Sequence, residues 1–360
     1  AYVDIDINGH RETWPLRSKV FKEYLTRQFY LAHRKPPGSQ AMEDALRTLA
    51  GKAKFECETR TIHTRIAAHG DTIYIDMCNT DWQAIKITCD GWKIVDEPPV
   101  RFMRRKGVRP LPIPDPDGDA SLLFKYVNLH SEDEKKLILG WLVQTLRPTG
   151  PYPALIFQGE QGTAKTTACR VMVRLLDPKL AETRTKPRNE QDLLIAANNS
   201  WLVSLDNLSG VPTWLSDALC RLATGGGFSA RELFTDMEEI LIDVKRPVVL
   251  NGIDDVAVRP DLIDRSIILT LAPIAEQDRK TESEFWYHFG QDSGKILGGL
   301  LDGLVVANRD YRDVRLPGHP RMADFAVWAT AAEPAFGYQQ GQFLKSFDKK
   351  RENAIQAGLE

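Results

Sequence analysis

The sequence predicts an α/β protein with a parallel-sheet core, preceded by a small α+β domain and followed by a helical region. From Ala154 onward, four short apolar runs alternate with helical segments, which is typical of strands buried on both faces of a parallel sheet. These runs are ALIFQG, WLVSLDN, RPVVLNG and SIILTLAP. Before residue 110, two helical patterns give way to runs of period two that predict short strands. After Pro273 the pattern is mostly helical.

The chain divides into four segments. We expect residues 1–110 to form the small α+β domain, 111–150 a linker and a helical pair, 151–273 the sheet core, and 274–360 the helical region. The linker starts as PLPIPDPDGD, a stretch rich in turn-forming Pro, Asp and Gly. The chain begins without Met and ends within a helical pattern, so we expect a fragment of a longer polypeptide.

Composition narrows the class of protein and its surroundings. The chain has 360 residues, of which 42% are hydrophobic and 27% charged, so it can bury a sizeable core. Its formal net charge of −2 gives no overall attraction to nucleic acid, so such binding needs a local patch. Five scattered cysteines without a C-x-x-C pair indicate a reducing, cytoplasmic location and argue against a zinc site. We find no signal peptide or membrane-length apolar run, and expect no membrane partner.

The stretch IFQGEQGTAKTTA, residues 156–168, has the pattern of a phosphate-binding loop between a strand and a helix. Such a loop needs inward-facing N–H groups, a helix whose positive end faces the phosphates, a lysine and a magnesium-binding hydroxyl. Lys165 would supply the charge and Thr166 the hydroxyl. The nucleotide-binding residues would be Gly159, Glu160, Gln161, Gly162, Thr163, Ala164, Lys165, Thr166 and Thr167.

Ala164 stands where the usual loop has its last glycine. We expect a negative φ there, as at a helix start, so that the added methyl group costs little. The alternative is an ordinary strand–turn–helix without a ligand, and the residues further along the chain decide between the two.

Asp206 ends the next apolar run, 41 positions after Lys165. In a phosphate-loop ATPase the neighbouring strand ends in such an Asp, which holds magnesium through water. Asn207 follows it, where many hydrolysing ATPases have a Glu that orients the attacking water. Three alternatives stay open: Asp206 performs both tasks, another carboxylate enters the site, or hydrolysis is slow. Without the loop, Asp206 and Asn207 would be ordinary turn residues.

Two further positions complete the candidate site. Asn251 ends the run RPVVLNG and would position the attacking water beside the γ-phosphate; its alternative is an Asn that satisfies its own turn. Arg259 and Arg265 precede the last run, where an arginine at a subunit edge reaches a neighbour's γ-phosphate. Otherwise each is a solvated surface arginine.

Taken together, these elements resemble the helicase modules of superfamily 3 within the AAA+ ATPases, as found in poxvirus-type and phage-type primase–helicase proteins of mobile elements. The likeness covers roughly residues 121–273 and includes GEQGTAKTT, LVSLDN, FSARELFTD, VVLNG and DLIDRSI. Its spacing favours Arg265 over Arg259 as the arginine finger. The departures are Asn207 and an acidic hairpin tip, TDMEE, which Arg231 and Lys245 flank.

The resemblance implies an AAA+ P-loop ATPase that uses ATP and Mg²⁺. It implies a ring of identical subunits, a hexamer, that translocates on single-stranded or forked DNA as a replicative helicase. It also implies a joined or separate primase–polymerase as partner. On this resemblance, the catalytic residues would be Lys165, Asp206, Asn207, Asn251 and Arg265, with Thr166 and Asp206 at the metal.

The sharpest basic cluster is RFMRRKGVR, residues 101–109. Its cations would follow a phosphate backbone while Phe102 stacks on a base; a solvated charged face is an equally good interpretation. The candidate nucleic-acid contacts are Arg101, Arg104, Arg105, Lys106, Arg231 and Lys245. The helix starting near Leu16 is basic too, but its aromatic residues have core spacing, which favours packing.

Two other functions share the loop. A nucleotide-switch regulator or loader would bind ATP and remodel a complex without unwinding, and Asn207 favours this slightly. A small-molecule phosphotransferase would act as a monomer, because it needs no arginine from a neighbour.

Overall fold

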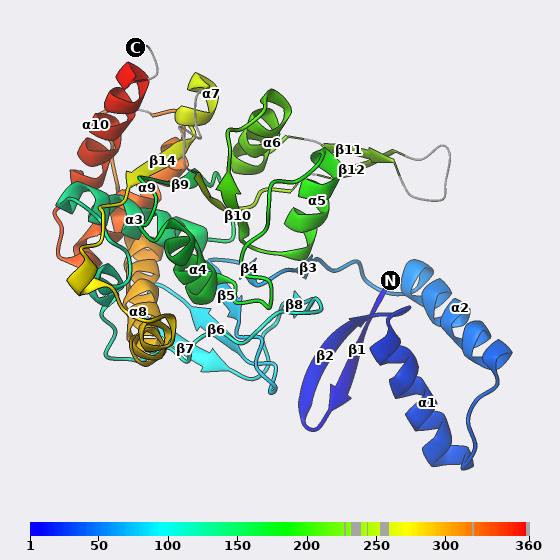
Figure 1. Cartoon of the computed structure of the whole chain (residues 1–360). Helices are drawn as coiled ribbons and strands as arrows, with labels where there is room; N and C mark the ends of the chain where they lie inside the picture. The colour runs from blue at the N-terminus through cyan, green and yellow to red at the C-terminus, as the bar shows by residue number, and fades with distance from the viewer. Residues whose placement is uncertain (227, 232–238, 243, 253–258, 319, 358–360) are drawn as a thin grey trace.

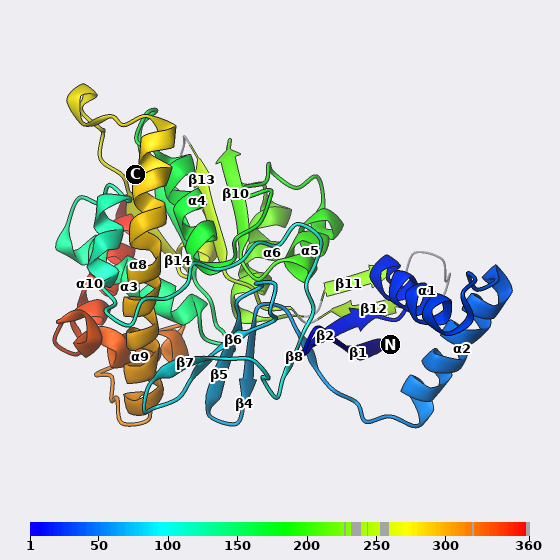
Figure 2. The same cartoon turned by 90° about the horizontal axis from the view of Figure 1, so that it is seen from below.

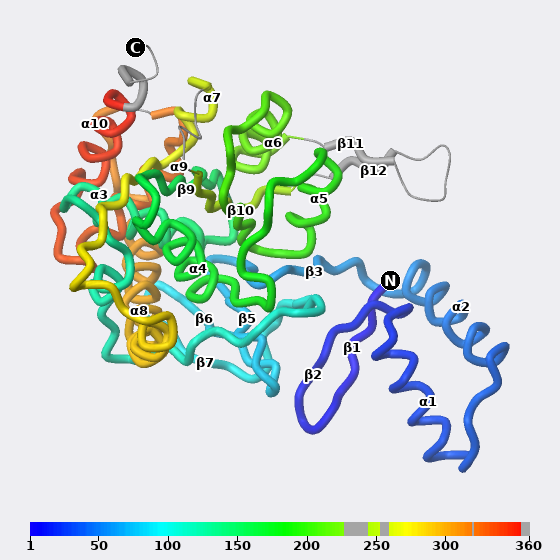
Figure 3. The backbone as a smooth tube through the Cα atoms, viewed as in Figure 1, coloured from blue at the N-terminus to red at the C-terminus, as the bar shows by residue number. Residues whose placement is uncertain are grey.

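The computed structural model describes residues 1–226, 228–231, 239–242, 244–252, 259–318 and 320–357 (Figure 3). The fold is mixed α/β, as the sequence predicts, with one four-stranded parallel sheet and one four-stranded antiparallel sheet among the described residues. In this part of the chain, no helix combines the length and hydrophobicity that a membrane span needs.

The parallel sheet contains all four predicted apolar runs: β9 (Ala154–Gln158), β10 (Val203–Leu208), β13 (Val248–Gly252) and β14 (Ser266–Thr270). The strand order is β10-β13-β9-β14, and every neighbouring pair is parallel. We expected the strand of Asp206 to neighbour the strand before the loop. That expectation is wrong, because β13 lies between them.

Helices cover both faces of this sheet (Figures 1 and 2). Successive residues of a strand point to opposite faces. Accordingly, Leu155 and Phe157 of β9 share one hydrophobic cluster with α4 (Lys165–Leu176), whereas Ile156 belongs to a second cluster. The second cluster includes residues of α5 (Glu190–Asn199), α6 (Thr213–Thr224) and the short α7 (Pro260–Ile263).

The chain begins with a small unit that the sequence predicts only in part. The predicted helices are α1 (Lys19–His33) and α2 (Ser39–Phe55), but a hairpin of β1 (Tyr2–Ile7) and β2 (His10–Pro15) precedes them. The hairpin turns at Asn8 and Gly9, whose φ values of 51° and 86° suit these two residue types. The core of this small unit, which the hairpin shares with α1 and α2, is formed by Ile5, Leu16, Phe21 and Leu46. We call residues 1–55 the N-terminal unit (Figure 1).

The strands that follow pack against the main body of the protein. β4 (Ile66–His69), β5 (Thr72–Asp76), β6 (Ala84–Ile87) and β7 (Trp92–Val95) form an antiparallel meander, and β3 (Ile62–His63) pairs with β8 (Arg101–Phe102) beside it. Ile73, Ile75 and Ile85 share a hydrophobic cluster with α4. The meander thus shares its core with the segment that contains α4. The segment boundaries predicted from the sequence, including the one at residue 110, stay a proposal.

The remaining helices lie beside α4. They are α3 (Glu132–Thr145), α8 (Glu282–Asp310), α9 (Ala323–Ala332) and α10 (Gln342–Ala357), with the 3-10 turns η1 (Ala120–Lys125), η2 (Glu276–Asp278) and η3 (Glu333–Phe336). The linker lies directly on α8: the N–H of Asp115 donates to the carbonyl of Gly294 at 3.0 Å. A Cβ at Gly298 would meet the Asp115 carbonyl oxygen at 2.0 Å, so this contact requires glycine.

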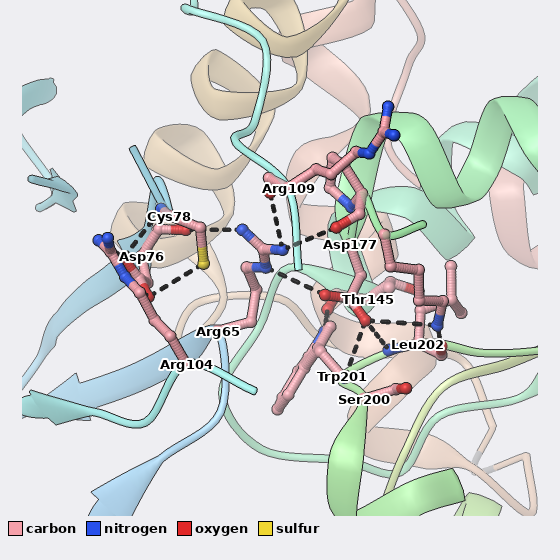
Figure 4. A network of polar contacts seen from close by, with 12 residues as sticks. Arg65, Asp76, Cys78, Arg104, Arg109, Thr145, Asp177, Ser200, Trp201 and Leu202 are labelled. Carbon is pink, nitrogen blue, oxygen red and sulfur yellow. Dashed lines mark hydrogen bonds and ion pairs between the residues drawn. The ribbon is translucent and has the colours of Figure 1, made fainter. Parts of the chain in front are cut away.

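A buried polar network fixes the far end of α4 (Figure 4). Arg65 donates to Asp177, the residue that caps α4, at 3.1 Å, and to the Asp76 carbonyl at 3.1 Å. Asp177 also accepts from the N–H groups of Trp201 at 3.0 Å and Leu202 at 3.2 Å, just before β10. Burial raises the pKa of Asp177, but Lys179, Arg65 and the Leu202 N–H more than offset it, so the pKa lies below its ordinary value. The network joins the meander, α4 and β10.

Candidate nucleotide site

The predicted phosphate loop leaves the carboxyl end of β9 and enters α4. Gly159 has a φ of 141°, and a Cβ there would lie 2.9 Å from the Leu271 carbonyl oxygen, so glycine is required. Thr163 is buried and donates to the Glu160 carbonyl at 2.9 Å. Lys165 donates through Nζ to the carbonyls of Gly159 and Glu160, at 2.7 Å each. These carbonyls hold the ammonium beside the loop, where a phosphate would compete for it.

The structure corrects the expected conformation of Ala164. Its φ of 62° and ψ of 31° are left-handed, and it caps the N-terminus of α4 without a side-chain hydrogen bond. We expected a negative φ, but the chain turns sharply between Gly162 and the first turn of α4, and Ala164 takes up that turn. The conformation costs a non-glycine residue about 1–2 kcal/mol. It also explains why glycine is usual at this position of the loop.

The start of α4 favours an anion electrostatically. The first N–H groups of a helix have no partner within the helix, and the helix dipole places partial positive charge at that end. Lys165 and Thr166 occupy the first two positions of α4. The first turn contains no acidic residue to neutralise this field.

Three of the predicted side chains meet at the carboxyl edge of the sheet. Thr166 donates from Oγ1 to Asp206 Oδ1 at 2.8 Å, and Asn251 donates from Nδ2 to the same oxygen at 2.7 Å. The residues come from α4, β10 and β13, and they meet because parallel strands end at one edge. Magnesium prefers oxygen ligands, and the hydroxyl of Thr166 and the carboxylate of Asp206 fit that preference.

Asn251 is tied to its neighbours on both sides. It is 2% exposed, its Oδ1 accepts from the N–H of Asn207 at 2.9 Å, and its Nδ2 also lies 3.3 Å from Cys169 Sγ. These contacts orient Asp206. The alternative of an Asn that satisfies its own turn concerns residues after Gly252 that lie outside the described part of the chain. Positioning of an attacking water by Asn251 stays a prediction.

Asn207 has a φ of 55°, in the left-handed region. Asn tolerates this conformation better than most residues, and Glu does not share that tolerance. The backbone therefore gives a physical reason for Asn at this position, and the three alternatives for the catalytic base stay open.

A cavity that sequence reasoning missed opens beside the start of α4. It has a volume of about 920 Å³ and touches Ala164, Thr167 and Ala168. Its lining residues include Phe124, Tyr126, Arg170, Phe285 and Trp286. In the stretch FWYHF, residues 285–289, Phe289 is buried, whereas Phe285 and Trp286 line this cavity. Arg170 and Arg174 lie over the Trp286 ring, at 4.7 and 3.5 Å from its centroid.

The two candidate finger arginines lie at the amino end of the sheet. Arg265 precedes β14, and its Nη1 lies 2.9 Å from Asp261 Oδ1; Arg259 faces Asp217 at 3.1 Å. Because β14 runs parallel to β9, Arg265 is about one strand length, roughly 16 Å, from the edge where its own phosphate loop lies.

Several side chains of the basic cluster, residues 101–109, are buried or paired with carboxylates. Arg101 forms an ion pair with Asp4, Arg104 forms two hydrogen bonds to Asp76 at 2.7 and 3.1 Å, and Phe102 is buried. The proposed stacking by Phe102 is therefore wrong, and two of the cations already have carboxylate partners. Arg105 is half-buried and Lys106 exposed.

The other predicted nucleic-acid contacts surround the hairpin. β11 (Phe228–Arg231) and β12 (Glu239–Ile242) pair antiparallel, as expected. Residues 235–238 of the acidic tip and the Arg231 side chain lie outside the described residues. Lys245 is exposed.

Fold and site define a mixed α/β protein whose phosphate-loop-like turn faces an Asp, a Thr and an Asn at one sheet edge. Residues 120–349 match the family of replication proteins of actinomycete integrative conjugative elements. The match covers more than half of the chain, and the chain belongs to this family.

Other comparisons are weaker. A search of curated proteins found no match. A solved structure of the NrS-1 C-terminal region in its apo form is 14% identical over 82% of this chain and 64% of that chain, with a TM-score of 0.44. A structure described as the active helicase SCCmec type IV Cch is 13% identical over 99% of this chain and 70% of that chain, with a TM-score of 0.47. With TM-scores this low, neither likeness supports an inference about this chain.

Proposed function

We propose that this replication protein is an ATP-driven DNA helicase or translocase with an AAA+ P-loop core of superfamily 3 type. The observation that carries the proposal is the meeting of Thr166 and Asp206, 2.8 Å apart, at the turn that leads into α4. Phosphates would lie on the N–H groups of the loop and first helical turn, with Lys165 at the terminal phosphates. A magnesium ion held by Thr166 and Asp206 would neutralise charge on the phosphates.

In this proposal, the base and ribose of the nucleotide would lie in the cavity beside Ala164. The cavity adjoins the loop and combines aromatic side chains with cations, which suits a base and a ribose. Tyr126 and Trp286 would contact the base, and Arg170, already held by Glu182 and Glu282, would keep Trp286 in place.

We further propose that hydrolysis takes place between subunits of a ring. Arg265 is remote from its own loop, is 14% exposed and pairs with the half-exposed Asp261, so at a subunit boundary it would exchange this partner for a neighbour's phosphate. Ring size, a hexamer by resemblance, and a primase–polymerase partner belong to the same proposal.

The test measures ATP hydrolysis with and without single-stranded DNA. We expect stimulation by DNA, complete loss in Lys165→Ala, and partial recovery when Lys165→Ala and Arg265→Ala subunits are mixed, because each supplies what the other lacks. If single-stranded DNA left the rate of ATP hydrolysis unchanged over a range of salt concentrations, the proposal of an ATP-driven DNA motor would be overturned. An active monomer would overturn the ring and favour a phosphotransferase.

Asn207 supports a second candidate, a nucleotide-switch regulator or loader. An amide holds a water but does not accept its proton, so slow hydrolysis with tight ATP binding would suit a switch. Strand displacement on a forked duplex separates the two, since only a helicase performs it.

A further inference from the structure

Helix α1 and the residues next to it carry an uneven charge. Residues 17–35 contain six Lys or Arg and one acidic residue, whereas residues 39–58, which include α2, contain three basic and four acidic residues. The whole chain has a net charge of −2. The positive charge of the N-terminal unit is therefore concentrated on α1 and the residues that flank it.

Burial divides α1 into two faces. Phe21 is 2% exposed, and Tyr24 and Leu25 pack against the same small core. Tyr30 is 50% exposed and lies three residues after Arg27, so these two side chains are neighbours on the helix surface, and the exposed Arg34 follows as the C-cap of α1. Tyr30 is therefore an exposed aromatic residue outside the packed face of this helix.

Apart from Lys19, the cations on the exposed face of α1 have no side-chain partner among the described residues and can therefore contact a ligand. Lys19 lies 3.6 Å from Glu23, but among the described residues no ion pair or hydrogen bond involves the side chains of Lys22, Arg27 or Arg34. This contrasts with Arg101 and Arg104, whose guanidinium groups have carboxylate partners.

We propose that the α1 basic face, formed by Lys22, Arg27, Tyr30 and Arg34, binds single-stranded DNA. The cations contact successive phosphates and Tyr30 stacks on an unpaired base, a combination that suits single strands better than a duplex. The proposal draws on the proposed function only for the choice of DNA. Figures 1 and 2 place the N-terminal unit on the same side of the sheet core as β11 and β12, where the resemblance expects DNA.

The test uses the full chain without nucleotide and a labelled 30-nucleotide single strand, titrated at several salt concentrations by fluorescence anisotropy. The α1 variant changes Lys22, Arg27 and Arg34 to Gln. The matched control changes Arg47, Lys52 and Lys54 of α2 to Gln, which removes the same charge from the same unit. Circular dichroism checks that both variants keep their helices.

We expect the α1 variant to bind roughly 100-fold more weakly at 0.1 M salt, with the salt slope reduced by about 2, because each single-strand phosphate contact contributes about 0.7. The α2 control should stay within about threefold of wild type. Tyr30→Ala should weaken binding about tenfold, and Tyr30→Phe should not.

Equal effects of the α1 and α2 variants, or no effect of either, would overturn the proposal. Tighter binding of a duplex or of RNA of the same sequence would overturn the choice of single-stranded DNA. Lys165→Ala should bind DNA like wild type, so failure of the ATPase proposal and failure of this one are distinguishable.

Discussion

Replacing Ala164 with glycine should stabilise the protein, although glycine inside a helix is usually destabilising. Ala164 has a φ of 62° and a ψ of 31°. The left-handed region costs alanine about 1–2 kcal/mol. Glycine avoids this cost. However, glycine makes the unfolded chain more flexible, which lowers the free energy of unfolding by about 0.5–1 kcal/mol. The difference is a net stabilisation of roughly 0.5–1 kcal/mol, which would raise the Tm by about 1 °C in a chain of this size.

The assay is thermal and urea unfolding of Ala164→Gly, Ala164→Val and a control, Ala168→Gly, on the same helix. Ala168 lies within α4 and is buried, so glycine there should destabilise by about 1 kcal/mol or more. Val should be worse than Ala at position 164, because β-branched residues avoid positive φ. Loss of stability in Ala164→Gly equal to that in Ala168→Gly would refute the left-handed conformation.

Four further changes test other contacts. Gly298→Ala should destabilise by about 1–3 kcal/mol because its Cβ would strike the linker, whereas Gly290→Ala on the same helix, with open space around it, should be neutral or stabilising; urea unfolding compares them. Asp177→Ala should cost about 3–5 kcal/mol at pH 7 by leaving Arg65 buried without its partner. Because the folded-state pKa of Asp177 is lowered, its stabilisation is present above about pH 4 and fades as the pH falls through the folded value, so wild type and variant should converge in acid. Asn251→Leu should lower kcat for ATP hydrolysis at least tenfold by releasing Asp206, with circular dichroism unchanged. Trp286→Ala should weaken ATP binding about tenfold in a titration, while inorganic triphosphate, which lacks a base, should bind as before.

The sequence predicts the sheet core well because its signals are local. Four apolar runs bounded by turn residues became the four parallel strands, and Lys165, Thr166 and Asp206 were recognisable from their positions at strand and helix ends. The hairpin at Asn8 and Gly9 was also predictable, since Asn-Gly between alternating residues is a strong turn signal that we did not weigh.

Other features depend on contacts between distant segments. The insertion of β13 between β9 and β10 follows from packing, and only it places Asn251 against Asp206. The partners of Arg101 and Arg104 lie 97 and 28 residues away, so a run of cations in sequence said nothing about their availability. The φ of Ala164 is a backbone property that residue type alone predicts poorly.

The most direct measurement of the central claim is calorimetric binding of a non-hydrolysable ATP analogue, with and without Mg²⁺. We predict saturable binding that Mg²⁺ tightens, about 100-fold weaker binding in Lys165→Ala, and loss of the Mg²⁺ effect in Asp206→Asn. Binding that is equal in all three proteins, or no binding by the wild type, would contradict a nucleotide site at this loop.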